Sequence, residues 1–112
     1  MDMGSIAELQ AWYVAQCDGD WAHTYGVQVE TLDNPGWMLK IDVRDTSLEG
    51  VRFEEVKDNH DHERDWMRCW LEGDVFNGVC GPLRLEDMIR VFLDWSASSN
   101  KPMQTDGPSG RR

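Results

Sequence analysis

Two acids, a tryptophan and a histidine stand close together in Cys17-Asp18-Gly19-Asp20-Trp21-Ala22-His23. Carboxylates and an imidazole are the groups of a metal site or of general acid–base catalysis. In loops, the same side chains also cap helix ends and bond to backbone amides. The spacing does not match an EF-hand loop, which needs a further acid at its twelfth position. We interpret Asp18, Asp20, Trp21 and His23 as partner-binding or structural residues. A small metal-dependent hydrolase that uses Asp18, Asp20 and His23 is the alternative.

A second group of similar residues follows in Asp33-Asn34-Pro35-Gly36-Trp37. Asx side chains, the fixed φ of proline and the freedom of glycine predict a tight turn. An exposed aromatic ring among acids is typical of an interface hot spot, so Asp33, Asn34 and Trp37 are further candidates for partner binding. The alternative is that Trp37 packs in the core and the other residues serve the turn. In that case we expect the interface on the charged loop from Lys57 to Asp65.

The remaining reactive residues give no catalytic pattern. Three cysteines, far apart and odd in number, form neither a disulfide framework nor a zinc motif. His60 and His62 lie in a hydrophilic run that reads as a solvated loop. The chain has no Gly-rich phosphate loop, G-x-S-x-G or H-E-x-x-H motif. We therefore expect no enzyme activity, no cofactor and no metal.

Length and charge narrow the class of partner. The 112 residues fit one domain, and the formal net charge is −10. Acidity argues against binding nucleic acid, because affinity for phosphates comes from Lys and Arg. It favours association with a basic protein, or it only keeps the chain soluble. No signal peptide and no 18-residue apolar run is visible, so we expect a cytoplasmic protein without a membrane anchor.

Periodicity predicts the elements that hold these loops. Ser5 and Glu8 match a capping box at the start of a helix over residues 5–17. Alternating apolar residues on both sides of the Asp33–Gly36 turn predict a hairpin. Further expected elements are an irregular strand over 51–56, a strand over 66–71, a short strand or turn over 75–78 and a helix over 84–96.

The predicted fold class is α+β: an antiparallel meander of about four strands with an N-terminal and a C-terminal helix packed on one face. Residues 1–97 form the expected domain, and residues 98–112 are expected to be a disordered polar tail. Oligomeric state does not follow from the sequence, although an exposed edge strand from Val51 to Val56 could pair with another copy.

The chain resembles the immunity protein 53 family over most of residues 9–95. The resemblance is carried by Trp12-Tyr13, by Gln16-Cys17-Asp18-Gly19-Asp20-Trp21, by His23 and Tyr25-Gly26, and by Thr31-Leu32-Asp33-Asn34-Pro35-Gly36-Trp37 with Ile41-Asp42. The closing helix from Leu85 to Trp95 also fits the end of the family. Where the family usually has an acid after the first motif's Trp, this chain has Ala22. The Gly81-Pro82 step matches only loosely, and the tail beyond Ala97 has no counterpart.

The resemblance implies a cytoplasmic binder and not an enzyme. Such proteins are associated with bacterial polymorphic toxin systems and would occlude a cognate toxin. Many of these toxins are nucleases with basic clefts, so an acidic inhibitor could occupy the place of nucleic acid. The expected partner is therefore a toxin with a basic surface.

Overall fold

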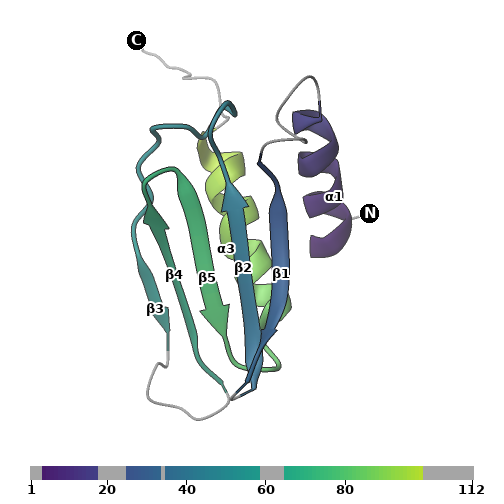
Figure 1. Cartoon of the computed structure of the whole chain (residues 1–112), viewed down its shortest axis with the longest axis vertical. Helices are drawn as coiled ribbons and strands as arrows, with labels where there is room; N and C mark the ends of the chain where they lie inside the picture. The colour runs from purple at the N-terminus through teal and green to yellow at the C-terminus, as the bar shows by residue number, and fades with distance from the viewer. Residues whose placement is uncertain (1–3, 18–24, 34, 59–64, 100–112) are drawn as a thin grey trace.

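The structure is a computed structural model that describes residues 4–17, 25–33, 35–58 and 65–99. Within these ranges it contains a five-stranded antiparallel sheet and two helices (Figure 1). The α+β class expected from the sequence is thereby confirmed. The elements in chain order are α1 (Ser5–Gln16), β1 (Val27–Leu32), β2 (Gly36–Asp42), β3 (Val56–Asp58), β4 (Met67–Glu72), β5 (Val75–Cys80) and α3 (Leu85–Ser99).

The strands lie in the order β1-β2-β5-β4-β3. The predicted hairpin is present, with Val29 opposite Leu39 and Thr31 opposite Trp37. The segment expected to form a short strand or turn is instead the central strand β5, which pairs with both β2 and β4. The sheet is therefore not a simple meander, because its last strand lies between the second and the fourth.

The third strand is shorter than predicted. The expected strand over 51–56 contributes only Val56 to β3, and the residues before it adopt no strand. Phe53 packs edge-on against Phe76 and Trp95, with ring centroids 5.3 and 5.2 Å apart. The Trp95 indole also donates a hydrogen bond of 2.9 Å to the Arg52 carbonyl. Side-chain packing on α3 thus replaces strand pairing in this segment.

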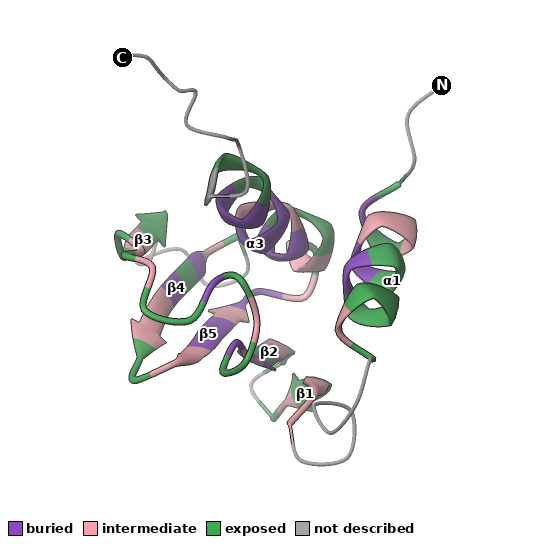
Figure 2. Cartoon of the chain, turned by 90° about the horizontal axis from the view of Figure 1, so that it is seen from above, coloured by how far each residue is buried: buried purple, intermediate pink, exposed green. Residues whose placement is uncertain are grey.

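The helices form a second layer on one face of the sheet. Helix α3 contacts β5, β2 and β4, whereas α1 packs on α3 (Figure 2). Trp12 of α1 meets Phe92 of α3 edge-on, with ring centroids 4.9 Å apart. The alternate face of each strand supplies the core below α3, including the fully buried Leu39, Ile41 and Phe76. No helix of the described residues is long and apolar enough to cross a membrane.

The prediction of a capping box at the start of α1 is wrong. The N-cap residue is Gly4, and no side chain caps the helix. Glu8 turns toward α3 and accepts hydrogen bonds of 3.1 and 2.8 Å from Arg90, which also donates to the Ser5 hydroxyl at 3.2 Å. A tertiary ion pair between the helices competes for the side chains that the local motif would have used.

Candidate partner-binding site

Of the predicted site residues, the structure describes Asp33 and Trp37. Asp33 and Trp37 flank the β1–β2 turn at one end of the sheet (Figure 1). The other five predicted site residues lie outside the described part of the chain: Asp18, Asp20, Trp21, His23 and Asn34. The residues that flank the first group, Cys17 and Tyr25, lie at the opposite end of β1. Tyr25, which precedes β1, and Asp33, which follows it, are separated by six strand residues that span about 20 Å.

Trp37 links the turn to the segment that precedes α3. Its side chain is partly buried against the core, and its indole N–H donates a hydrogen bond of 3.1 Å to the Pro82 carbonyl. A buried indole needs such an acceptor, so Trp37 has a structural role in holding these segments together. Asp33 is exposed beside it. The partner contact predicted for both residues stays a prediction.

Arg84 gathers three carboxylates at this end of the sheet. Its guanidinium donates to Asp58 at 2.7 Å, Asp65 at 3.0 Å and Asp87 at 2.8 Å, from three separate segments. These hydrogen bonds, led by the one to Asp58, raise the pKa of Arg84 above its ordinary value. The arginine side chain is 15% exposed, but each carboxylate side chain is more than half exposed. Three negative charges around one positive charge leave a net excess of acid that a cationic partner can reach.

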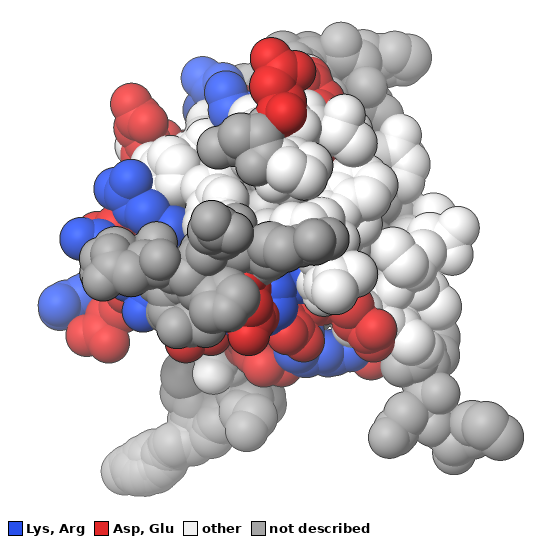
Figure 3. Space-filling model, turned by 90° about the horizontal axis from the view of Figure 1, so that it is seen from below, with Lys and Arg blue, Asp and Glu red and all other residues white. Residues whose placement is uncertain are grey.

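Leu83 adds an apolar contact beside this acidic cluster. It precedes Arg84 and is 84% exposed, the largest exposure among the described large apolar side chains. Figure 3 views this end of the molecule and shows charged side chains gathered over the sheet. An exposed apolar side chain among charged neighbours matches the composition of a protein interface with a polar rim. We call Leu83, Asp58, Asp65 and Asp87 the acidic end.

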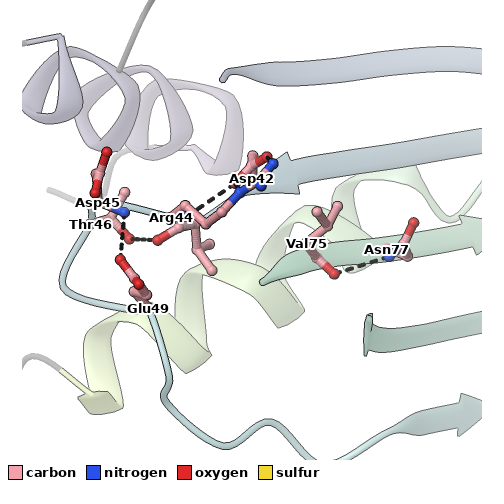
Figure 4. Close-up of polar contacts among 8 residues, drawn as sticks. Asp42, Arg44, Asp45, Thr46, Glu49, Val75 and Asn77 are labelled. Atoms are coloured by element: carbon pink, nitrogen blue, oxygen red, sulfur yellow. Dashed lines mark hydrogen bonds and ion pairs between the residues drawn. The ribbon is translucent and has the colours of Figure 1, made fainter. Parts of the chain in front are cut away.

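The opposite end of the sheet carries an internally paired network. Arg44 donates to both carboxylate oxygens of Asp42, at 3.0 and 2.6 Å, and its guanidinium lies 4.7 Å from the Tyr25 ring centroid. These hydrogen bonds hold the pKa of Asp42 below its ordinary value. The backbone N–H of Asp45 donates to Glu49 at 2.8 Å in the following turn (Figure 4). This end is therefore ordered by its own contacts.

An open pocket of about 470 Å³ lies beside this network, on the sheet face that α3 leaves uncovered. Its lining combines an amine and a carboxylate with neutral groups: Tyr25, Gly26, Val27, Gln28, Lys40, Asp42 and Val75. The lining holds no histidine, serine or cysteine that could act as a nucleophile or proton shuttle. Its chemistry suits binding more than catalysis.

The described residues give little support to catalysis elsewhere. Among them, no group of three or more His, Cys, Asp or Glu side chains is placed to hold a metal ion. Burial raises the pKa of the Cys69 thiol to about 12 and that of Cys80 to about 11. Both remain protonated thiols near neutral pH and are poor nucleophiles. The hydrolase alternative rests on residues outside the described part of the chain and gains no support here.

The sequence did not single out Arg84 or Leu83. Arg84 joins acids that are 26 and 19 residues away, and only its contact with Asp87 at i,i+3 follows from helical spacing. The charged loop over 57–65 was named as the fallback interface, and its described ends, Asp58 and Asp65, both belong to the acidic end. The exposure of Leu83 follows from the fold, and the sequence around Pro82 carries no signal of it.

Comparison with known proteins supplies the classification. Neither curated proteins nor solved structures give a match. The sequence model described as immunity protein 53 matches residues 6–97, which include all the described helices and strands except Ser5 of α1 and the last two residues of α3. The match covers most of the chain, so this protein belongs to the immunity protein 53 family.

Proposed function

We propose that this immunity protein binds a cognate bacterial toxin through the acidic end and neutralises it by occlusion. The observation that carries the proposal is the exposed Leu83 beside the Arg84 cluster. Apolar contact supplies affinity at the centre of such a surface, while the carboxylates steer a basic partner toward it. The chain would act by binding and not by catalysis.

The charge of the acidic end defines the kind of toxin. A nuclease fits best, because its active cleft presents Lys and Arg to nucleic-acid phosphates. The carboxylates of Asp58, Asp65 and Asp87 would take the place of those phosphates. Blocking an intracellular nuclease requires the immunity protein in the cytoplasm of the producing cell, and we propose that location.

The first test is binding to the candidate toxin encoded by the neighbouring gene. We expect the two proteins to co-purify and calorimetry to give one-to-one binding with a nanomolar Kd. Because surface charges are screened over about 8 Å at physiological salt, affinity should fall as salt is raised. A complex whose affinity is insensitive to salt, or a toxin that proves acidic, would remove the electrostatic part of the proposal.

A matched pair of variants locates the contact. Leu83→Ala and Val14→Ala both shorten an exposed aliphatic side chain, 84% and 67% exposed respectively. An interface hot spot is worth about 2 kcal/mol or more, which is roughly thirtyfold in Kd. We expect that loss for Leu83→Ala and no change for Val14→Ala. Equal affinities for both variants would place the toxin contact elsewhere.

A further inference from the structure

One side of this acidic protein carries almost no charge. Helix α1 contains a single charged residue, Glu8, and that carboxylate is bonded to Arg90. A groove of about 420 Å³ runs between α1 and the start of β1, lined by side chains that include Leu9, Tyr13 and Val27. Figure 3 shows the surface over α1 largely free of charged atoms. Four exposed large apolar side chains lie on these two elements: Ile6, Tyr13, Val14 and Val29.

Strand β1 also presents an unpaired backbone edge along this side. The Asp42 N–H donates to the Gly26 carbonyl at 3.2 Å, so Gly26 faces β2. Hydrogen-bonded and non-bonded pairs alternate along an antiparallel ladder. The N–H and C=O groups of Val27, Val29 and Thr31 therefore point outward, away from β2. Among the described residues, no strand pairs with this edge.

The two edges of the sheet are not equally protected. At the far edge, β3 has only three residues, and a short edge strand resists pairing. Strand β1 has six residues and contains no lysine or proline, which are the usual guards of an edge. As far as the described residues show, its outward edge is therefore available to another strand of matching pattern.

We propose that a second copy of this chain pairs with β1 in antiparallel register, with Val29 opposite Val29. Residues opposite each other must share a face of the sheet, so the sum of their numbers must be even. The strand over 27–32 overlaps best with itself at sums of 58 and 60. A sum of 60 would place two Glu30 carboxylates opposite each other, and like charges there are unfavourable.

A sum of 58 gives a self-complementary pair. Gln28 then faces Glu30 of the second copy, and its amide can donate to that carboxylate. Val27 and Thr31 exchange backbone hydrogen bonds with their counterparts, as do the two Val29 residues. The pairing therefore satisfies all three outward-facing residues of each strand and creates no like-charge contact within the ladder.

The same symmetry brings uncharged helices to the interface. Helix α1 borders the groove at residues 25–27. In the register with Val29 opposite Val29, these residues lie opposite residues 31–33 of the second copy. Helix α1 of the second copy would therefore approach the other half of β1, next to the 44% exposed Val29. Because each chain carries a net charge of −10, the copies repel at long range, and added salt should strengthen the dimer.

Sedimentation equilibrium of the whole chain, from about 1 µM to about 1 mM, tests the proposal. We expect the average mass to rise from 12.9 kDa toward twice that value, and to rise further at high salt. The Val29→Pro variant should stay monomeric. Its proline removes an outward N–H and no internal hydrogen bond, so circular dichroism should show a normal fold. A wild-type chain that is monomeric throughout overturns the proposal.

Charge swaps test the register itself. Val29→Lys and Val29→Glu should each be monomeric, because like charges would face across the two-fold axis. Mixing the two variants should restore a dimer that contains one copy of each. The control is Glu54→Lys, which changes a side chain that is 86% exposed and precedes β3 at the opposite edge of the sheet, and which should still dimerise. Dimers that survive in both single variants, or a mixture that stays monomeric, would refute the Val29 register. Toxin binding enters none of these measurements, so their failure leaves the proposed function untouched.

Discussion

Gly78 in the central strand is the position where a single methyl group should be most informative. A Cβ added there would lie 2.6 Å from the Met88 sulfur, 2.9 Å from Met88 Cγ and 3.5 Å from the Cys69 sulfur. Met88 belongs to α3 and is fully buried, so its side chain cannot move into solvent. Overpacking of this kind costs about 1–3 kcal/mol, against a gain of about 0.5–1 kcal/mol from replacing glycine. We expect Gly78→Ala to lower the free energy of unfolding by about 1 kcal/mol.

Shortening Met88 should reverse the sign of that effect. Met88→Ala alone leaves a cavity and costs about 2–5 kcal/mol. In the double variant, the new methyl group at residue 78 occupies part of that cavity without a clash. The two changes should therefore couple by about 1–2 kcal/mol, with Gly78→Ala neutral or stabilising in the Met88→Ala background.

Urea unfolding followed by tryptophan fluorescence measures all four proteins of this cycle. A change of 1 kcal/mol corresponds to about 4–8 °C in Tm for a domain of this size, so thermal melts give an independent reading. Additive effects would show that the methyl group does not meet Met88. A stabilised Gly78→Ala single variant would refute the proposed close packing of α3 on β5.

Three further predictions rest on other contacts. Gly36→Ala should lower the free energy of unfolding more than Gly78→Ala does. The Cβ of the new alanine would meet the carbonyl oxygen of Cys80, and a backbone atom cannot be shortened as Met88 can. Chemical unfolding compares the two variants, and a smaller loss of stability for Gly36→Ala would contradict the prediction. The unfolded chain releases thiol protons near pH 9, whereas folded Cys69 and Cys80 hold theirs to pKa values of about 12 and 11. Stability should thus fall as pH rises above 9, and a double serine variant should lose part of that fall in melts from pH 8 to 11. Arg84→Met leaves three carboxylates without their shared cation and should cost roughly 1–2 kcal/mol after allowance for their exposure; salt near 1 M should shrink the deficit by screening, and a deficit unchanged by salt would argue for lost packing instead.

The hairpin was predictable because local and global preferences agree there. Strict alternation on both strands and the chemistry of the turn predict a hairpin, which the sheet confirms. Strand β5 was not predictable in the same way. Its Asn77 and Gly78 are poor strand formers, and the glycine is required because Met88 of α3 approaches the backbone closely. That requirement is tertiary, so a local pattern cannot show it.

The candidate site also combines a part that local sequence shows and a part that depends on tertiary contacts. The acidic end depends on Arg84, whose partners arrive from the end of β3, from the segment before β4 and from α3. Sequence spacing could not assemble that cluster. The uncharged side of the molecule, by contrast, was readable from α1, which has one charged residue in twelve. The structure was needed to recognise this side as a candidate interface, because only the sheet order shows that β1 is an edge strand beside α1.

The two proposed contacts should respond to salt in opposite directions, and this separates them in one preparation. The acidic end attracts a basic partner, so screening weakens that complex. The β1 edge joins two chains of charge −10 through β1 and α1, which hold one acidic residue each, so screening strengthens it. The surfaces also lie on different elements, with Leu83 before α3 and Val29 on β1. A dimer of immunity proteins could therefore hold two toxin molecules. Calorimetry at low and high salt should give one toxin per immunity-protein chain at both micromolar and millimolar concentration, because each protomer of the dimer keeps its own toxin-binding surface. A stoichiometry of one toxin per dimer would mean that the two surfaces overlap.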